Sequence, residues 1–351
     1  MQYERLGNTG LIVSRLALGA FTFTQGNRSL SSVYKVGAEL ADALVNRAID
    51  AGINLFDTAD VYADGESEAL LGAALRPHRD KIVISSKVGN RSNGQRELTK
   101  GCLSRRHILW SIDESLKRLG TDWIDLYIAH REDTCTPLEE TLDAFDSVVR
   151  AGKVRYLGFS NWSAWTASAA MEIQKANGLA PFTHGQMYYS LLGRDIERDV
   201  LPMMARYGLG LTVWSPLAYG FLGGRYTRES MTQADNRFSN FDMLKFDHDK
   251  GFELLDLMRK IATARDITVA QVAIGWLLRK QTVTSIMLGA TKISQLEDNL
   301  GAVNVQLSDE DMAHLDAATT IPPIYATSQW IEPDVRIARA LTAGRRPDGA
   351  C

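Results

Sequence analysis

Ile53-Asn54-Leu55-Phe56-Asp57-Thr58-Ala59-Asp60-Val61-Tyr62 is the stretch that decides how this chain folds. Its first half is a short apolar run that ends in the carboxylate of Asp57, and Tyr62 follows in what reads as a loop. Runs of the same kind, rich in β-branched and large apolar residues and ended by a polar residue, recur along the chain. We expect a strand at each of them: 15–19, 53–57, 82–87, 124–130, 154–160, 182–186, 210–215 and 285–289.

Helical patterns separate these runs. Short strands without polar alternation need helices on both faces of their sheet, so the pattern predicts an α/β protein whose parallel sheet closes into a (β/α)8 TIM barrel. A doubly wound open sheet is the alternative, but it gathers its ligand-binding residues at one switch point, whereas here polar residues end nearly every strand. The expected helices span 40–51, 66–75, 104–119, 138–151, 164–176, 195–207, 252–280 in two pieces, and 293–303.

Three segments extend this plan. Residues 1–18 alternate around Asn8-Thr9-Gly10, which predicts an N-terminal β-hairpin that closes the barrel bottom. The connection 219–250 is too long for a plain barrel loop and is typical of a lid or a cofactor clamp. We expect the tail 319–351 to lie over the barrel mouth with its last residues disordered, and the whole chain, 1–351, to form a single domain.

The composition of the 351 residues is that of an ordinary globular protein, with 45% hydrophobic and 23% charged residues. A formal net charge of -3 offers no attraction to nucleic acid or acidic membranes, so we expect a small, mostly uncharged partner and leave the oligomeric state open. Cys102, Cys135 and Cys351 form no CxxC pair, which argues against a disulfide framework and a structural zinc site, and we expect no metal. The charged start and the lack of an apolar run of ~20 residues favour a cytoplasmic protein.

The polar strand ends bring separate parts of the sequence to one place. In a (β/α)8 barrel the carboxyl ends of all strands gather on one face, so these residues would ring a single cavity. Each of them alone would more often be a solvated or structural side chain, and their shared position is what predicts a site. They are Asp57, Lys87, His130, Ser160, Gln186, Ser215 and Gly289.

Four side chains suggest proton transfer to a carbonyl oxygen. The phenol of Tyr62, with a reference pKa of about 10, releases a proton near neutral pH only beside a cation. At ~4 Å the Lys87 ammonium would contribute about 4 kcal/mol, or roughly three pK units, enough to bring the phenol into a working range. Asp57 would hold Lys87 charged, and His130 would donate a hydrogen bond to the substrate oxygen or relay the proton. Because no side chain supplies a hydride, a nicotinamide cofactor is implied.

Other rim residues suit that cofactor. Ser160, Asn161 and Gln186 carry hydroxyl and amide groups for a carboxamide, and Trp214 offers an aromatic face for the nicotinamide ring. Cations in the long loop and at the start of the last barrel helix would meet the phosphates, helped by the free amides of that helix. No GxGxxG follows an N-terminal strand, so a Rossmann-type site has no support. The phosphate-side residues are Arg225, Arg237, Thr291 and Lys292.

Five motifs resemble the aldo-keto reductases, over about Tyr3 to Ala318. The glycine and aromatic pattern is most similar to the bacterial branches and to the potassium-channel β subunits. The motifs are Tyr3-Glu4-Arg5-Leu6-Gly7-Asn8-Thr9-Gly10-Leu11, Gly52-Ile53-Asn54-Leu55-Phe56-Asp57-Thr58-Ala59, Gly158-Phe159-Ser160-Asn161-Trp162, Trp214-Ser215-Pro216-Leu217-Ala218 and Leu288-Gly289-Ala290-Thr291.

This resemblance implies a reversible reduction of an aldehyde or ketone that depends on NADP(H), with NAD(H) as the alternative cofactor. The family's catalytic tetrad corresponds to Asp57, Tyr62, Lys87 and His130, with Tyr62 as the acid and base at the substrate oxygen. The implied cofactor-binding residues are Ala20, Phe21, Asp57, Ser160, Asn161, Gln186, Trp214, Ser215, Pro216, Leu217, Ala218, Tyr219, Arg225, Arg237, Gly289, Thr291, Lys292, Gln295, Asp298 and Asn299.

Two departures from the family pattern bear on the cofactor. Arg225 stands where related branches usually have lysine, and Asp298 stands where glutamate is common. The shorter side chain of Asp298 would reach the adenine amino group less well than glutamate. The charges of Lys292 and Arg237 favour NADP(H) over NAD(H). The substrate walls would be aromatic and polar, a lining that suits sugars, aromatic aldehydes and polycyclic ketones alike. They would come from Phe21, Phe23, Tyr62, His130, Arg131, Trp162, Tyr188 and Trp330.

Two other functions stay open at this point. A barrel aldolase would use Lys87 as a Schiff-base nucleophile, but that function leaves Trp214 and the carboxamide-binding group unexplained. A redox-sensing subunit would bind NADP(H) and dock on another protein, as the resemblance to channel β subunits allows. The presence of His130 in the tetrad favours catalysis over the second of these.

Overall fold

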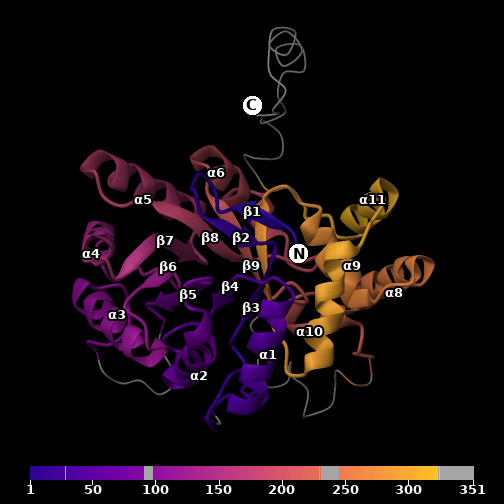
Figure 1. Ribbon diagram of the computed structural model, residues 1–351. Coiled ribbons are helices and arrows are strands. Elements are labelled where there is room, and N and C mark those ends of the chain that lie inside the picture. The colour runs from indigo at the N-terminus through magenta and orange to yellow at the C-terminus, as the bar shows by residue number, and fades with distance from the viewer. Residues whose placement is uncertain (28, 91–97, 229, 231–244, 323, 325–351) are drawn as a thin grey trace, which may run out of the picture. The chain divides into compact units, whose positions relative to one another are not determined.

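The computed structural model describes residues 1–27, 29–90, 98–228, 230, 245–322 and 324. Eight parallel strands close into a barrel in which each strand pairs with its neighbours along the chain, and the last barrel strand pairs with the first (Figure 1). The eight expected strands are therefore confirmed, with end points that shift by up to two residues. The strands are β3 (Leu16–Gly19), β4 (Leu55–Asp57), β5 (Val83–Val88), β6 (Ile124–Ala129), β7 (Val154–Ser160), β8 (Phe182–Tyr188), β9 (Gly210–Trp214) and β10 (Val283–Leu288).

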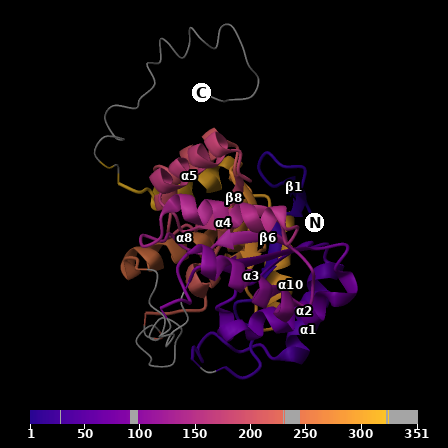
Figure 2. The ribbon, with the colours of Figure 1, turned by 90° about the vertical axis from the view of Figure 1, so that its left-hand side faces the viewer.

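Helices form the outer layer around these strands (Figure 1 and Figure 2). Local signals set their ends: Ser104 caps α3 by accepting a hydrogen bond from the amide of His107, and Gly120 ends it at a left-handed φ of 65°. The expected helical segments are confirmed, and α11 is an additional helix. The helices are α1 (Ala38–Asp50), α2 (Glu66–Leu75), α3 (Arg105–Leu119), α4 (Leu138–Arg150), α5 (Ala164–Asn177), α6 (Val200–Tyr207), α8 (His248–Arg265), α9 (Val269–Leu278), α10 (Ile293–Leu300) and α11 (Asp309–Ala318).

The predicted N-terminal hairpin is present and closes the barrel floor. Strands β1 (Tyr3–Arg5) and β2 (Ile12–Ser14) pair antiparallel. Leu6 and Val13, both fully buried, pack in one cluster with barrel residues such as Leu55 and Val83, the first residues of β4 and β5. Between the two strands, a Cβ atom on Gly7 would lie 2.6 Å from the amide nitrogen at the start of β9, so only glycine fits this approach.

Residues Met1–Thr319 form one compact unit, and Thr320–Cys351 form a second. The tail predicted to lie over the barrel mouth, with Trp330, lies outside the described residues except for 319–322 and 324. Residues 229 and 231–244 of the predicted lid, Arg237 among them, also lie outside the described residues, and the single-domain organisation of 1–351 stays a prediction.

Among the described residues, no single helix is long and apolar enough to cross a membrane. The pair α8 and α9, which is bent by 92° at the break between them, passes the same test by length and composition only. Most of α9 is buried against the rest of the unit, which accounts for its apolar composition.

Candidate active site

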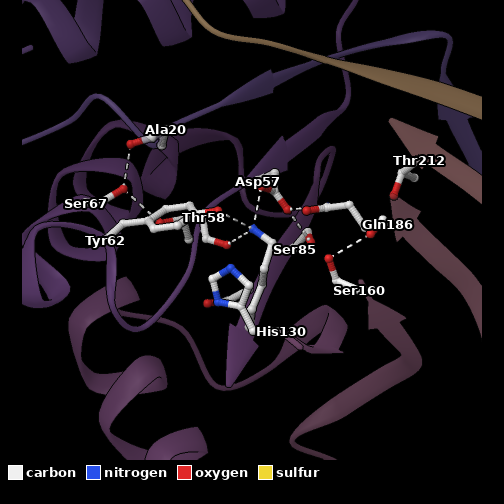
Figure 3. A network of polar contacts seen from close by, with 12 residues as sticks. Ala20, Asp57, Thr58, Tyr62, Ser67, Ser85, His130, Ser160, Gln186 and Thr212 are labelled. Carbon is white, nitrogen blue, oxygen red and sulfur yellow. Dashed lines mark hydrogen bonds and ion pairs between the residues drawn. The ribbon is translucent and has the colours of Figure 1, made fainter. Parts of the chain in front are cut away.

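The carboxyl ends of the barrel strands bring the four predicted catalytic side chains together. Asp57 is the last residue of β4, Lys87 lies in β5, and His130 directly follows β6. Tyr62 begins a short 3-10 helix, η1 (Tyr62–Gly65), in the loop after β4. Figure 3 shows Asp57, Tyr62 and His130 converging with Gln186 of β8 on one place.

Lys87 makes hydrogen bonds to three other residues of this site. Its Nζ atom donates hydrogen bonds to Asp57 Oδ2 and to the carbonyl oxygen of Thr58, both at 2.6 Å, and to the hydroxyl of Tyr62 at 3.2 Å. The residue is fully buried. Burial alone would lower the pKa of Lys87, but the carboxylate of Asp57 and the phenol of Tyr62 raise it above its ordinary value. Lys87 is therefore a fixed ammonium beside the Tyr62 hydroxyl.

Asp57 is held on both of its oxygens. While Oδ2 binds Lys87, Oδ1 accepts hydrogen bonds from Ser85 Oγ at 2.8 Å and from Gln186 Nε2 at 2.9 Å (Figure 3). This bond uses one N–H of the Gln186 amide, so the amide oxygen and the second N–H stay available to a ligand. Ser85, one strand along and opposite Asp57 in the register of β4 and β5, was not among the predicted site residues.

The pKa of Tyr62 corrects the electrostatic prediction. Burial raises the pKa of this phenol more than the Lys87 ammonium lowers it, so the pKa lies above its ordinary value. Lys87 does lower the pKa of Tyr62, as predicted, but by less than the loss of water around a phenolate raises it. Tyr62 is thus fully protonated at neutral pH, the form that a proton donor needs, and Lys87 stabilises the phenolate once the proton has left.

His130 lies edge-on to Tyr62, with the two ring centroids 5.7 Å apart. Burial, the Lys87 ammonium and Arg131 together hold its pKa well below the ordinary value. The imidazole is therefore neutral and has one N–H to donate. Its Nδ1 atom is buried and has no hydrogen-bond partner among the described residues.

A strained turn follows Tyr62. Ala63, Asp64 and Gly65 all have positive φ angles, of 49°, 54° and 92°, a conformation that costs energy in non-glycine residues. The turn is anchored by Glu66, which accepts hydrogen bonds from Thr24 Oγ1 at 2.7 Å and from the amide of Gln25 at 2.6 Å. Backbone strain of this kind is typical of positions that hold a functional side chain in place.

A cavity of about 1170 Å³ opens above these residues. Its volume exceeds the usual range of roughly 300–1,000 Å³ for ligand sites, which leaves room for a ligand larger than a typical small molecule. The predicted site residues that line it are Phe21, Asp57, Tyr62, His130, Arg131, Ser160, Asn161, Gln186, Trp214, Ser215, Pro216, Leu217, Tyr219, Arg225, Gly289, Thr291, Gln295, Asp298 and Asn299.

Three predicted substrate-wall residues do not line this cavity. Phe23 is fully buried in the hydrophobic core, whereas Phe21 lines the cavity. Trp162 packs edge-on to Phe182 with ring centroids 5.5 Å apart and lines only a small separate pocket. Tyr188 lines that same pocket, and its ring lies 5.2 Å from Trp214, so it supports that indole.

Three predicted cofactor-binding residues do not line the cavity. Ala20 and Ala218 are fully buried and do not line the cavity, and the carbonyl oxygen of Ala20 accepts a hydrogen bond from Ser67 at 2.7 Å (Figure 3). Lys292 is exposed at the N-cap of α10 and does not line the cavity. Its long side chain keeps a phosphate role open as a prediction.

The residues predicted to hold a carboxamide are linked to one another. Asn161 donates from Nδ2 to Ser160 Oγ at 2.9 Å and accepts from Trp214 Nε1 at 3.0 Å. Ser160 Oγ donates in turn to the backbone oxygen of Gln186 at 2.7 Å. Asn161 also has a positive φ of 57°. This network fixes the polar groups and the indole beside the tetrad, which suits a flat polar ring.

Asp298, which the sequence predicts to contact the adenosine end of the cofactor, also makes contacts within the protein. The carboxylate of Asp298 accepts hydrogen bonds from Thr268 Oγ1 and Gln271 Nε2, both at 3.1 Å, at the start of α9. Asp298 therefore ties α10 to α9, and its oxygens are shared with these protein donors. Arg225 lies over the ring of Tyr226 at 4.8 Å and also lines the cavity.

Several lining residues were missed by the sequence reasoning. Most of them lie in the loop after β3, which has no regular periodicity of its own, and Leu288 is the last residue of β10. The aromatic ring of Tyr34 is the most notable, because it stands 6.0 Å edge-on from Phe21. The unpredicted lining residues include Thr22, Ser29, Ser32, Tyr34, Lys35, Asp64, Asn90, Tyr226 and Leu288.

Comparison with known proteins adds a family to this geometry. A family model described as the aldo/keto reductase family matches residues 15–320. A probable voltage-gated potassium channel subunit beta of Oryza sativa subsp. japonica is 38% identical over 313 residues, covering 87% of this chain and 92% of the relative. Probable aldo-keto reductase 1 of Glycine max is 33% identical, covering 92% and 90%. Versiconal hemiacetal acetate reductase of Aspergillus parasiticus is 33% identical, covering 90% and 96%.

Proposed function

This chain belongs to the aldo/keto reductase family, and we propose that it is an NADP(H)-dependent oxidoreductase that reduces an aldehyde or ketone to the alcohol, reversibly. The observation that carries the proposal is the 3.2 Å contact between Lys87 Nζ and the Tyr62 hydroxyl at the base of a large cavity. A half-buried phenol beside a fixed ammonium can give a proton to a carbonyl oxygen, and the ammonium stabilises the phenolate that remains.

Each member of the tetrad has one task in this scheme. A bound nicotinamide supplies the hydride. Tyr62 gives its proton to the substrate oxygen, and Lys87 stabilises the phenolate that is left. Asp57 keeps Lys87 charged and in place through their 2.6 Å contact. The neutral imidazole of His130 donates a hydrogen bond to the same substrate oxygen and so polarises the carbonyl.

The cofactor assignment is supported by the network around Trp214. Ser160, Asn161 and the amide oxygen of Gln186 would hold the carboxamide, and the indole of Trp214 would carry the nicotinamide ring. Arg225 would meet the phosphates. We favour NADP(H) over NAD(H) because Arg225 lines the cavity and Lys292 is exposed at the N-cap of α10, while the carboxylate of Asp298 is already shared with Thr268 and Gln271.

Trp214→Ala is expected to weaken NADP(H) binding about tenfold, because aromatic stacking contributes ~1–3 kcal/mol and about 1.4 kcal/mol is a factor of ten. Quenching of protein fluorescence on titration with NADPH gives the dissociation constant. Trp165→Ala is the matched control, since Trp165 is 73% exposed in the first turn of α5 and lines no part of the cavity. An unchanged dissociation constant in Trp214→Ala would remove the stacking role.

The two directions of the reaction should depend differently on pH. Reduction needs protonated Tyr62, which burial secures by raising the pKa of the phenol above its ordinary value. Oxidation of the alcohol needs the phenolate, whose fraction grows about tenfold per pH unit below that pKa. Initial oxidation rates with NADP+ should therefore climb steadily from neutral into alkaline solution. A pH-independent oxidation rate would speak against Tyr62 as the base.

The Schiff-base alternative is disfavoured by the state of Lys87. A nucleophilic amine needs a free lone pair, whereas Nζ is fully buried, charged and bound to Asp57, Thr58 and Tyr62. Borohydride treatment with candidate aldehydes should leave Lys87 unmodified, and a trapped adduct at this residue would support the aldolase.

A regulatory subunit is the second candidate function. Relatives from Oryza sativa, Arabidopsis thaliana and Schizosaccharomyces pombe carry the name of potassium channel subunit beta, and such a protein would bind NADP(H) and act through another protein. Measuring NADPH oxidation across aldehydes, ketones and sugars separates the two candidates. Turnover above background with any of them supports the oxidoreductase, and tight cofactor binding with background turnover throughout supports the regulatory subunit.

A further inference from the structure

Behind Tyr62 lies a second group of ionisable side chains that the proposed reaction does not use. Asp60 belongs to the loop between β4 and η1, Glu68 to α2, Arg118 to α3 and Tyr127 to β6. We call these four residues the Asp60 cluster. Glu68 and Tyr127 are fully buried. Ionisable groups are rarely placed together in a protein interior without a structural or functional reason.

Asp60 connects the loop of Tyr62 to two other elements. Its Oδ2 atom accepts a hydrogen bond from Ser111 Oγ of α3 at 3.0 Å. Its backbone amide donates to the carbonyl oxygen of Lys87 at 3.3 Å, in β5. Asp60 stands two residues before Tyr62, so the bonds that hold Asp60 also hold the start of the segment that carries the phenol.

The end of the turn that follows Tyr62 contacts the same helix, α3. Glu68 accepts from Ser86 Oγ at 2.5 Å and from Arg118 Nε at 2.6 Å. The side chain of Arg118 packs so closely on the turn that a Cβ atom on Gly65 would lie 2.6 Å from its Cδ atom. Helix α3 therefore holds the turn at two points, through Ser111 before Tyr62 and through Arg118 after it.

The Asp60 cluster contains one more carboxyl group than it has basic groups. It contains two carboxyl groups and one guanidinium, and the Oδ1 atom of Asp60 and the hydroxyl of Tyr127 are buried without a hydrogen-bond partner among the described residues. Burial and the nearby Glu68 raise the pKa of Asp60 to about 7, against the lowering effects of Ser111 and Arg118. The pKa of Tyr127 is raised well above its ordinary value, so that this group stays neutral.

We propose that Asp60 is a positioning residue for the reaction: in its charged form it is held by Ser111 and fixes the loop so that the Tyr62 hydroxyl meets Lys87, and on protonation that hold loosens. A carboxylate accepts a stronger hydrogen bond from a hydroxyl than a protonated carboxyl does. The kinetic part of this inference rests on the proposed function, whereas the structural part concerns Tyr62 alone.

Three residues of the tetrad have pKa values away from neutral pH. The pKa values of Tyr62 and Lys87 lie above their ordinary values, and that of His130 lies well below its own. A change in the environment of Tyr62 close to pH 7 would therefore report the Asp60 cluster. Within it, Glu68, Arg118 and Tyr127 are the ionisable groups that face Asp60.

The test follows the Tyr62 resonance in protein labelled with carbon-13 at the tyrosine ring, assigned by its loss in Tyr62→Phe. In the wild type it should shift with an inflection near pH 7. Asp60→Asn, which keeps the shape and removes the charge, should abolish the inflection. Ser111→Ala removes a donor to the carboxylate and should move the inflection to higher pH. Asp113→Asn, at an exposed aspartate on the same helix paired with Lys153, should leave it in place.

Turnover provides the second arm. With cofactor at saturation, the rate of carbonyl reduction should rise through the same inflection in the wild type and stay at the low-pH level in Asp60→Asn. If the resonance shows the inflection but no carbonyl is reduced, the proposed function fails and the hold of Asp60 on the loop stands. A Tyr62 resonance that is constant between about pH 6 and 8, or an inflection that persists in Asp60→Asn, would overturn the inference.

Discussion

Tyr62→Phe is expected to abolish carbonyl reduction, with a loss of at least about a thousandfold, and to leave the affinity for NADP(H) nearly unchanged. Phenylalanine keeps the ring, which packs 4.7 Å from Phe21 and 5.7 Å from His130, and removes only the hydroxyl that Lys87 contacts. The rate of NADPH consumption with a reactive aldehyde and a separate binding titration measure the two quantities.

The control for this variant is Tyr207→Phe. Tyr207 is the last residue of α6 and does not line the cavity. The substitution deletes a phenol hydroxyl that donates a hydrogen bond to Glu172 at 2.9 Å. The control should keep the wild-type rate. A Tyr62→Phe protein that retains most of its rate would show that the proton comes from another group.

Lys87→Met carries the second large effect, on activity and on stability together. Without the ammonium the phenolate of Tyr62 loses its stabilising charge, and we expect a rate loss of about a thousandfold. Asp57, 4% exposed and still bound by Ser85 and Gln186, is left as a buried charge without its cation. Breaking a buried pair in this way costs about 3–5 kcal/mol, so the midpoint of urea unfolding should fall clearly.

A double variant separates the two effects of Lys87. Adding Asp57→Asn to Lys87→Met removes the orphaned charge, so much of the lost stability should return while the rate stays low. Stability losses that simply add in the double variant would contradict the ion pair as the cause. Recovery of activity together with stability would contradict the assignment of Lys87 to the reaction.

The sequence was sufficient to predict where the site lies. Asp57, Lys87 and His130 each end or follow an apolar run, and a parallel barrel leaves only one face on which such ends can meet. Ser160, at the end of β7, follows the same rule. This reasoning needs only the order of the strands, and small errors in their ends do not affect it.

Side-chain direction outside the strands could not be predicted in the same way. Phe21 and Phe23 both follow β3, yet Phe21 lines the cavity and Phe23 joins the core. The loop that carries them is irregular, so side-chain direction does not follow the alternation of a strand. The bonds from Thr268 and Gln271 to Asp298 join two helices, and nothing local to Asp298 indicates them. Helix α11 has Leu315 as its one buried residue and so shows little apolar pattern.

The balance of forces on Tyr62 was also beyond the sequence. The neighbouring ammonium was predicted, but the burial that outweighs it depends on how Phe21, His130 and the strained turn enclose the phenol. The corrected direction leaves the role of Tyr62 intact and changes its resting state, which is the neutral proton donor at physiological pH.

The most direct test of the central claim is the fate of the hydride. The purified chain is incubated with an aldehyde and with NADPH that carries deuterium at C4 of the nicotinamide, in each of its two stereoisomers, and the product is analysed by mass spectrometry. We predict an alcohol with one deuterium on its carbon from one of the two stereoisomers, and no such alcohol from the Tyr62→Phe protein. Failure to form deuterated alcohol from either stereoisomer, across aldehydes, ketones and sugars, would contradict the assignment of this chain as a carbonyl reductase.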